Sequence, residues 1–295
     1  MGDRWQHYHL PTTVDEAIAL LSRYEGAARP VAGGTDLIVG MERGEVPPLP
    51  ALVDLSRIEE MRQIALGPDG YVYLGAAVTH STIERHPLIL AHARCLSEAC
   101  GLIGGPQVRN VATLGGNVAH ALPAADGTTA LMVLEAEAEI AGPEGRRWQP
   151  LPTLFAGPGR STLDLGREII VRFRFPTAGP GVGSAFTRLM RPQGVALPIL
   201  NCAVYVRLEG GRFADVRLCL GPVAPTPRRA TEAEEALRGE PVSEESVARA
   251  VAVAQQTLRP RTSPHRATAA YRREMIAVLL RRGLRQAISR AKTPG

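Results

Sequence analysis

Apolar residues in the N-terminal half of the chain follow two different periods. Between positions 13 and 23 they recur every three or four residues behind the sequence Thr-Val-Asp-Glu, which is typical of a helix that begins with a capping box. Shorter apolar stretches at 51–55 and 71–75 favour β-strands. Helical spacing returns at 88–100 and 123–135. The pattern therefore predicts short strands mixed with helices.

Turn residues divide the next part of the chain. The segments 137–141 and 146–151 flank Gly-Pro-Glu-Gly, which predicts a β-hairpin. Residues 168–175 alternate apolar and charged side chains, as a half-buried strand does. The glycine- and proline-rich segment 176–183 then ends all periodicity, so we expect a domain boundary there.

In the C-terminal part the strands come before the helices, which is typical of an α+β layer. The expected strands of an antiparallel sheet are 184–189, 202–208 and 216–220, and the expected helices are 231–238, 243–258 and 267–291. Because 295 residues exceed a single typical core, we expect two domains. The predicted domains are residues 1–178, with subdomains of about 1–57 and 58–178, and residues 179–295.

Two glycine pairs are the main candidates for binding chemistry. Val-Ala-Gly-Gly-Thr-Asp ends at Asp36, and Thr-Leu-Gly-Gly-Asn begins at Thr113. Glycine pairs let backbone N–H groups converge on an anion, so two such turns facing each other would suit a diphosphate. Neither segment has the Rossmann fingerprint or the phosphate loop of nucleoside triphosphatases. For either segment alone, a tight turn without a ligand is the alternative interpretation.

Four segments together carry a resemblance to a known family. They are residues 30–41, residues 108–126, residues 220–230 and the dipeptide Tyr271-Arg272 before the terminal helix. In these segments the chain resembles the FAD-binding medium subunit of the xanthine dehydrogenase and carbon monoxide dehydrogenase family, the molybdenum hydroxylases. The segment from Arg109 to Asp126 is the most specific part of the match.

The resemblance implies an α+β fold and a role in electron transfer. It implies a two-part FAD-binding domain of the vanillyl-alcohol oxidase or PCMH type, followed by a smaller domain of the CO dehydrogenase flavoprotein type. Such a chain is an oxidoreductase subunit whose FAD takes electrons from the [2Fe–2S] clusters of a small partner subunit and passes them to an external acceptor. The substrate is oxidised at a molybdenum cofactor on a large partner subunit. The expected assembly is a dimer of heterotrimers.

The resemblance also implies where FAD binds. The two glycine segments would wrap the diphosphate through the N–H groups of the glycines and Thr35, while Asp126 would bind a flavin hydroxyl. A helix N-cap is the alternative role for Asp126, with comparable weight. The predicted cofactor-binding residues are Ala32, Gly33, Gly34, Thr35, Asp36, Thr113, Leu114, Gly115, Gly116, Asn117 and Asp126. No catalytic acid, base or metal ligand is assigned.

Charge and hydropathy exclude other classes of partner. The net charge of +5 comes almost wholly from arginine and is concentrated in the terminal helix, where the basic residues alternate with apolar ones. We interpret this as the solvated face of an amphipathic helix, because only 4% of the residues are aromatic and a nucleic-acid surface needs stacking rings. No apolar run is long enough for a membrane span or a signal peptide, so we expect a cytoplasmic protein.

The cysteine pattern bears on metal chemistry. Cys95, Cys100, Cys202 and Cys219 form no C-x-x-C motif and lie in apolar surroundings. Ligation of zinc or an iron–sulfur cluster requires closer, repeated spacing, so we expect buried free thiols. The chain therefore has no cluster motif of its own.

Two other functions remain open at this point. A stand-alone flavin oxidase of the vanillyl-alcohol oxidase fold often attaches its flavin covalently to a histidine or cysteine, and His120 lies close behind the second glycine pair. The other alternative is a flavin-free interaction protein on the same scaffold. The visible spectrum of the purified chain distinguishes tightly bound, covalent and absent flavin.

Overall fold

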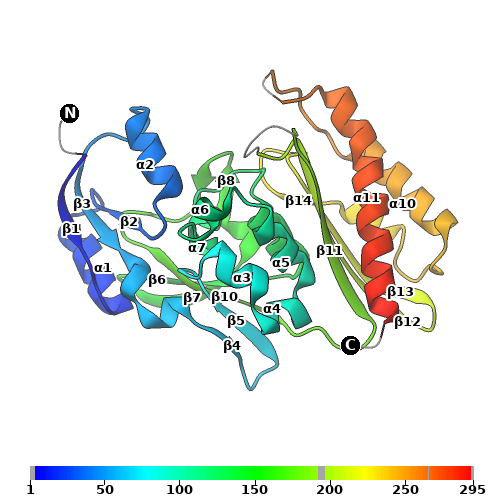
Figure 1. Ribbon diagram of the computed structural model, residues 1–295, viewed down its shortest axis with the longest axis horizontal. Helices are drawn as coiled ribbons and strands as arrows, with labels where there is room; N and C mark the ends of the chain where they lie inside the picture. The colour runs from blue at the N-terminus through cyan, green and yellow to red at the C-terminus, as the bar shows by residue number, and fades with distance from the viewer. Residues whose placement is uncertain (1–3, 192–196, 265, 294–295) are drawn as a thin grey trace.

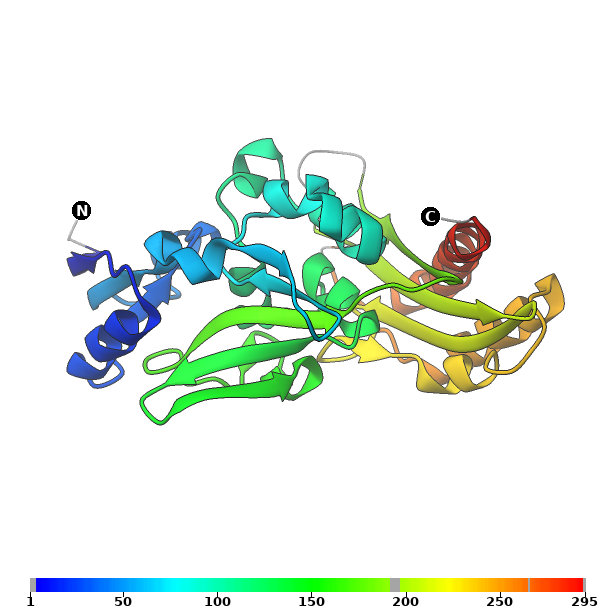
Figure 2. The same cartoon turned by 90° about the horizontal axis from the view of Figure 1, so that it is seen from below.

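The computed structural model describes residues 4–191, 197–264 and 266–293. The described chain runs from an N-terminal layer at one end, through a middle layer, to a C-terminal layer at the other end (Figures 1 and 2). Within these residues, no helix combines the length and the apolar character that a membrane crossing requires.

The N-terminal layer is a small parallel sheet with two helices. Its strands lie in the order β1-β3-β2, and every pair is parallel. Helix α1 begins at the predicted cap, because Thr13 Oγ1 accepts a hydrogen bond from Glu16 N at 3.1 Å. The other half of the predicted capping box differs, since the Glu16 carboxylate accepts from Thr12 N at 2.8 Å and not from Thr13 N. The elements are β1 (Trp5–His9), α1 (Val14–Arg23), β2 (Arg29–Val31), α2 (Thr35–Glu42) and β3 (Leu49–Asp54).

A five-stranded antiparallel sheet forms the middle layer, in the order β4-β5-β10-β6-β7. The strands of this layer are β4 (Ile64–Leu66), β5 (Tyr71–Gly75), β6 (Glu137–Gly142), β7 (Gly145–Pro150), the short pair β8 (Phe155–Gly157) and β9 (Arg160–Ser161), and β10 (Ile169–Pro176). The helices are α3 (His80–Arg85), α4 (Pro87–His92), α5 (Arg94–Gly101), α6 (Pro106–Arg109), α7 (Leu114–Ala119) and α8 (Asp126–Val133). Three short 3-10 turns are η1 (Leu55–Arg57), η2 (Glu59–Arg62) and η3 (Leu151–Leu154).

The C-terminal layer is an antiparallel sheet in the order β11-β12-β13-β14, with helices on one face. Its elements are β11 (Val182–Leu189), β12 (Leu200–Glu209), β13 (Arg212–Gly221), β14 (Arg228–Arg229), α9 (Thr231–Glu235), α10 (Glu244–Thr257) and α11 (Ala269–Lys292). Helix α11 lies along β11 and β12 and packs against α10 (Figure 1). The backbones approach closely, because a Cβ on Gly183 would lie 2.0 Å from Ala287 O.

The apolar cores show how the layers join. The largest buried cluster takes most of its residues from the N-terminal and middle layers, but it also contains Phe186, Ala203 and Cys219 of the C-terminal sheet. A second cluster fills the space between that sheet and helices α9, α10 and α11. The middle and C-terminal layers therefore share buried apolar surface.

Most of the predicted elements are confirmed, including the hairpin β6–β7, strand β10 and the terminal helix. Three helices differ from the prediction, and one of them, expected at 231–238, ends at Glu235. The helix expected at 88–100 is divided at Ala93, where Cys95 N of the following helix donates to Ser184 Oγ of β11 at 3.1 Å. The helix expected at 123–135 begins only at Asp126. The two glycine segments, expected as turns, each lead into a helix.

Candidate functional site

The first glycine segment joins strand β2 to helix α2. Gly34 is the N-cap of α2 with φ 66°, a left-handed conformation that favours glycine. The first bond of the helix runs from Ile38 N to Gly34 O at 2.9 Å, so the N–H groups of residues 35–37 precede the intrahelical ladder. Because no side chain caps this end, those N–H groups form a positive helix terminus that suits an anion.

The second glycine segment is arranged differently. Thr113 is the N-cap of α7, and its Oγ1 accepts a hydrogen bond from Gly116 N at 3.2 Å. Gly115 N donates to Ala76 O at 2.8 Å, and Asn117 N donates to Thr113 O at 3.0 Å. The N–H groups of both glycines therefore already have acceptors within the protein. This removes them from the donors expected for a diphosphate, and the symmetric picture of two equivalent N–H nests is wrong.

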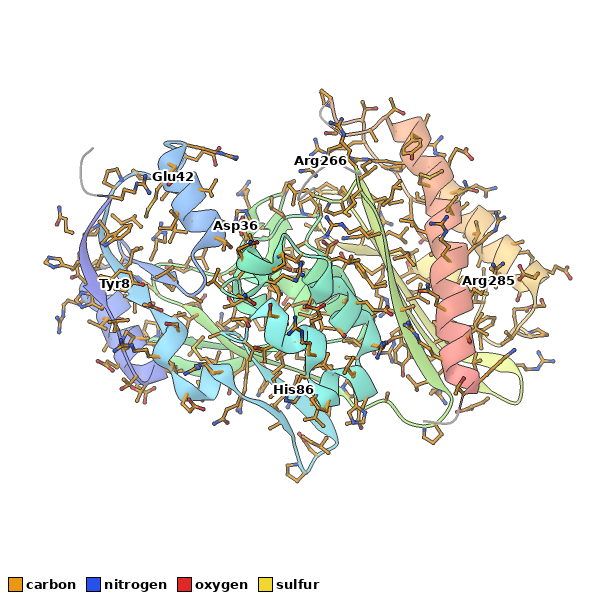
Figure 3. All side chains as sticks on the ribbon, viewed as in Figure 1. Tyr8, Asp36, Glu42, His86, Arg266 and Arg285 are labelled. Carbon is orange, nitrogen blue, oxygen red and sulfur yellow. The ribbon has the colours of Figure 1, made fainter. Side chains whose placement is uncertain are left out.

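Close backbone packing brings the two segments together. A Cβ on Gly33 would lie 2.2 Å from Val111 O, and a Cβ on Gly115 would lie 2.7 Å from the carbonyl oxygen of Ala76. Across the same junction, His120 Nε2 at the end of α7 lies 3.9 Å from Asp36 Oδ1 of α2. Asp36 is exposed on the side of α2 that faces the middle layer (Figure 3). Glycine is thus required here for contact between two parts of the chain as well as for a turn.

A pocket of about 80 Å³ opens beside this junction. Its walls include the second glycine pair, Thr113 and Ala32, and apolar side chains supply most of the remainder. Its lining residues are Pro30, Val31, Ala32, Leu55, Met61, Ala76, Thr113, Gly115, Gly116, Ala119, Leu165, Glu168, Ile169 and Ile170. The pocket is too small for a whole dinucleotide, so it suits one part of such a ligand.

A larger cavity of about 380 Å³ lies elsewhere, between α1 and the tip of the hairpin β6–β7. It contains none of the predicted site residues, and its one arginine, Arg146, is bound to Glu60 through hydrogen bonds of 2.7 and 2.9 Å. We therefore place the candidate site at the smaller pocket, where the glycine segments meet.

Asp126 faces the C-terminal sheet. Its carboxylate accepts hydrogen bonds from Arg188 Nη1 at 2.7 Å and from Asn201 Nδ2 at 2.6 Å, and the residue is 4% exposed. Burial raises the pKa of Asp126 to about 6, while Arg188 and Asn201 act in the opposite direction. The N-cap of α8 is Ala125, and no side chain caps this helix. The N-cap interpretation is therefore wrong, and we leave Asp126 out of the proposed flavin contacts.

The remaining predicted residues of the two segments differ in their burial and in their contacts. Leu114 is fully buried in the main core, so its side chain has a packing role. Asn117 Oδ1 accepts hydrogen bonds from the backbone N and the hydroxyl of Thr128, both at 3.2 Å, which ties α7 to the start of α8. Thr35 and Ala32 are half-buried at the junction.

The four cysteines are free and buried, as predicted. Burial raises the pKa of each thiol, so all four remain protonated near neutral pH. Among the residues that the structure describes, no three histidine, cysteine or carboxylate side chains are grouped as a metal site would require.

Comparison with known proteins identifies the family. Residues 3–178 match the model of the FAD-binding domain in molybdopterin dehydrogenase, and residues 184–287 match that of the CO dehydrogenase flavoprotein C-terminal domain. The chain belongs to the FAD-binding medium subunits of the molybdenum hydroxylases. The predicted α+β class, the FAD-binding domain with a C-terminal flavoprotein domain, and the role as an oxidoreductase subunit are confirmed. The exact domain boundaries stay a prediction.

The relatives match the chain nearly end to end. The xanthine dehydrogenase FAD-binding subunit of Escherichia coli O157:H7 is 32% identical over 96% of both chains. The carbon monoxide dehydrogenase medium chain of Hydrogenophaga pseudoflava is 33% identical over 96% of this chain and 97% of its own length. Among solved structures, carbon monoxide dehydrogenase from the same organism matches with a TM-score of 0.91, covering 98% of this chain and 99% of that chain. Quinoline 2-oxidoreductase from Pseudomonas putida 86 matches with a TM-score of 0.90 at 27% identity.

The residues present fit a FAD diphosphate and one apolar part of the cofactor. The uncapped N-terminus of α2 supplies N–H donors, and the pocket beside it combines the Thr113 hydroxyl with an apolar lining. Sequence reasoning missed Leu165, Ile169 and Ile170 of this lining, because they lie far along the chain, Leu165 in a turn and the two isoleucines in an ordinary strand pattern. It considered His120 only for covalent attachment, whereas the structure places it opposite Asp36.

Proposed function

We propose that this subunit takes electrons from the [2Fe–2S] clusters of a small partner subunit and passes them to an external acceptor. The observation that carries the proposal is the match of residues 3–178 to the FAD-binding domain model, together with an uncapped helix terminus at Gly34 inside that region. FAD supplies the redox chemistry when bound, because it accepts electrons one at a time and releases them as a pair.

The chain itself would bind and orient the cofactor. The N–H groups that open α2 would hold the diphosphate, and the close contact between Gly33 and Val111 would fix the distance between the two glycine segments. Thr113 would offer a hydroxyl at the wall of the pocket. The proposed binding residues are Ala32, Gly33, Gly34, Thr35, Asp36 and Thr113, together with Gly115 and Gly116, which would form part of the pocket wall without donating their N–H groups. Asn117 would act indirectly, by tying α7 to the start of α8.

We further propose a large molybdenum-cofactor subunit as the second partner, in a dimer of heterotrimers. The names of relatives support a division of labour, because they include carbon monoxide dehydrogenase, nicotinate dehydrogenase and nicotine 6-hydroxylase. Chains of similar sequence thus serve oxidations of molecules as different as carbon monoxide and pyridine compounds. We propose that the large subunit, and not this chain, determines the substrate specificity of the complex.

Reconstitution tests the proposal. The purified FAD-loaded chain is mixed with its small and large partner subunits, substrate is added without acceptor, and the visible flavin band is followed. We expect substrate-dependent bleaching only when both partners are present. Full turnover by this chain alone, with flavin and an acceptor dye, would overturn the proposal in favour of a stand-alone oxidase.

Acid precipitation tests how the flavin is held. A noncovalent FAD is released into the supernatant, whereas a flavin attached to His120 stays with the pellet. We expect release, because His120 faces the Asp36 carboxylate at 3.9 Å and lies outside the residues that line the pocket.

A further inference from the structure

Three arginines meet where α10 is connected to α11. The connecting loop is tied at its base by hydrogen bonds from Ser263 N to Ala267 O at 2.9 Å and from Ala269 N to Thr262 Oγ1 at 3.0 Å. Arg261 and Arg266 belong to this loop, and Arg272 lies in the first turn of α11. Figure 3 shows Arg266 at the upper edge of the C-terminal layer, near the start of α11, whereas α2 belongs to the N-terminal layer (Figure 1). The arginine cluster is thus separate from the glycine junction.

Arg272 is buried although its side chain is charged. The residue is 1% exposed, and its Nη1 donates to the backbone oxygen of Arg261 at 3.0 Å. Its Nε is also buried, and in the described part of the chain no atom accepts from it. A guanidinium in this setting has lost its hydration and has gained one hydrogen bond to a neutral carbonyl in return.

Among the residues that the structure describes, no carboxylate acts on Arg266 or Arg272 to offset their charge. The charged groups that act on Arg272 are Arg266 and Arg261, and these, together with burial, lower the pKa of its guanidinium. Burial and Arg261 lower the pKa of Arg266 in the same way. The N-terminus of a helix of 24 residues adds further positive potential at this point. The neighbouring arginines, their burial and the helix N-terminus therefore all favour the binding of an anion from outside the chain.

We propose that Arg261, Arg266 and Arg272 form a binding site for an oxyanion of the phosphate class. Guanidinium groups match the oxygens of phosphate in pairs, and a group with about two negative charges balances this cluster better than a single carboxylate does. The unpaired Nε of Arg272 is the donor that such a ligand would satisfy. Free phosphate and the phosphate of a nucleotide share this chemistry.

Calorimetric titration of the full-length chain with FAD bound tests the site. Inorganic phosphate is added at constant ionic strength, with sodium chloride as the reference, and ADP is used in a second titration. The flavin absorbance is recorded throughout, since phosphate could otherwise displace the cofactor diphosphate. We expect saturable binding of phosphate with no loss of flavin. ADP binding more tightly than phosphate would identify a nucleotide as the source, and equal or weaker binding would identify free phosphate.

Substitution locates the binding. We expect R261Q and R266Q each to weaken phosphate binding about tenfold or more, because each removes a charged donor. Both side chains lie at or near the surface, so these variants avoid the folding defect that R272M risks. The matched control is R273Q, an exposed arginine on the next position of α11, which should bind phosphate as the unaltered chain does. No saturable binding, binding only when flavin is lost, or equal weakening in R273Q would each overturn the proposal.

Discussion

At the scale of single residues, Asp126 links two layers through buried polar contacts. It begins α8 in the middle layer, while its partners Arg188 and Asn201 belong to β11 and β12. A buried carboxylate is tolerated only when its oxygens are hydrogen-bonded, and both oxygens have partners here. Removing Arg188 would leave the charge uncompensated, which is more costly than losing an exposed pair, and removing Asn201 would leave one buried oxygen without its donor.

The pH dependence of stability tests the state of this carboxylate. The folded-state pKa of Asp126 is raised to about 6 from an ordinary value of 3.8, so the folded chain binds more protons between these two values. Its contribution to stability is therefore fully present below the unfolded pKa and is lost as the pH rises through the folded pKa. We expect the free energy of unfolding of the unaltered chain, relative to D126N, to fall between about pH 4 and 6 and then stay level. Urea unfolding at several pH values measures this difference. A difference that increases with pH would show that Arg188 outweighs burial.

Gly33 sets the contact between the glycine segments, so Gly33→Ala should separate them. The added Cβ would lie 2.2 Å from the backbone oxygen of Val111, which cannot rotate away as a flexible side chain can. Overpacking of this kind destabilises by about 1–3 kcal/mol, and we also expect the purified variant to contain less flavin. Urea unfolding and the ratio of flavin to protein absorbance measure the two effects. Gly157→Ala is the control, because the nearest atom to its Cβ is 4.0 Å away. Equal behaviour of the two variants would contradict this role for Gly33.

At the scale of elements, α11 lies unusually close to the sheet beneath it. Glycine occurs on both sides of the contact: Gly183 in β11 faces the backbone of α11, and Gly283 in α11 faces Val204 of β12. The absence of side chains at these positions lets the helix backbone approach the strands. This places the arginine-bearing start of α11 in a fixed position relative to the sheet.

Gly183→Ala should push α11 away from β11. Its Cβ would lie 2.0 Å from Ala287 O, and neither the helix nor the strand can move alone without disturbing the second core. We expect a loss of about 1–3 kcal/mol in the free energy of unfolding. Gly179→Ala, four residues earlier, is the matched control, since its Cβ would meet nothing within 4 Å. Denaturant unfolding of both variants gives the comparison, and an unchanged stability of Gly183→Ala would disprove the close contact.

At the scale of the whole molecule, the middle and C-terminal layers are joined by polar as well as apolar contacts. Glu98 of α5 accepts a hydrogen bond from Phe186 N of β11 at 2.9 Å and is also paired with Arg290 of α11. Arg290 in turn donates to Ser184 O at 2.6 Å. One carboxylate thus connects an element of the middle layer with both the sheet and the long helix of the C-terminal layer.

Because the layers share a core and this network, the described chain should unfold as one unit. Differential scanning calorimetry is expected to show a single transition, with equal calorimetric and van't Hoff enthalpies. Glu98→Ala should lower the midpoint of that transition without dividing it, because the apolar contacts of Phe186, Ala203 and Cys219 remain. Two separated transitions in the unaltered chain would contradict the shared core.

The elements that could be predicted are those whose structure is determined by residues close together in the sequence. The hairpin β6–β7 and the start of α1 follow from residues adjacent in sequence, a Gly-Pro-Glu-Gly turn and a Thr13 cap. The break at Ala93 and the role of Asp126 depend on partners in β11 and β12, which no local pattern reveals. The glycine segments were found by their composition. Their unequal roles depend on Ala76 and Thr113 as acceptors, which only the folded chain brings into place.

The burial of the four cysteines has a practical consequence for chemical labelling. Maleimides react with the thiolate at accessible sites, and here every native thiol is both protonated and enclosed. A cysteine introduced on the surface would therefore carry the label alone, without prior removal of the native ones. The exposed residue Val111, whose backbone contacts Gly33, is one such position. A spin label or fluorophore there would report directly on the glycine junction as cofactor and partner subunits are added.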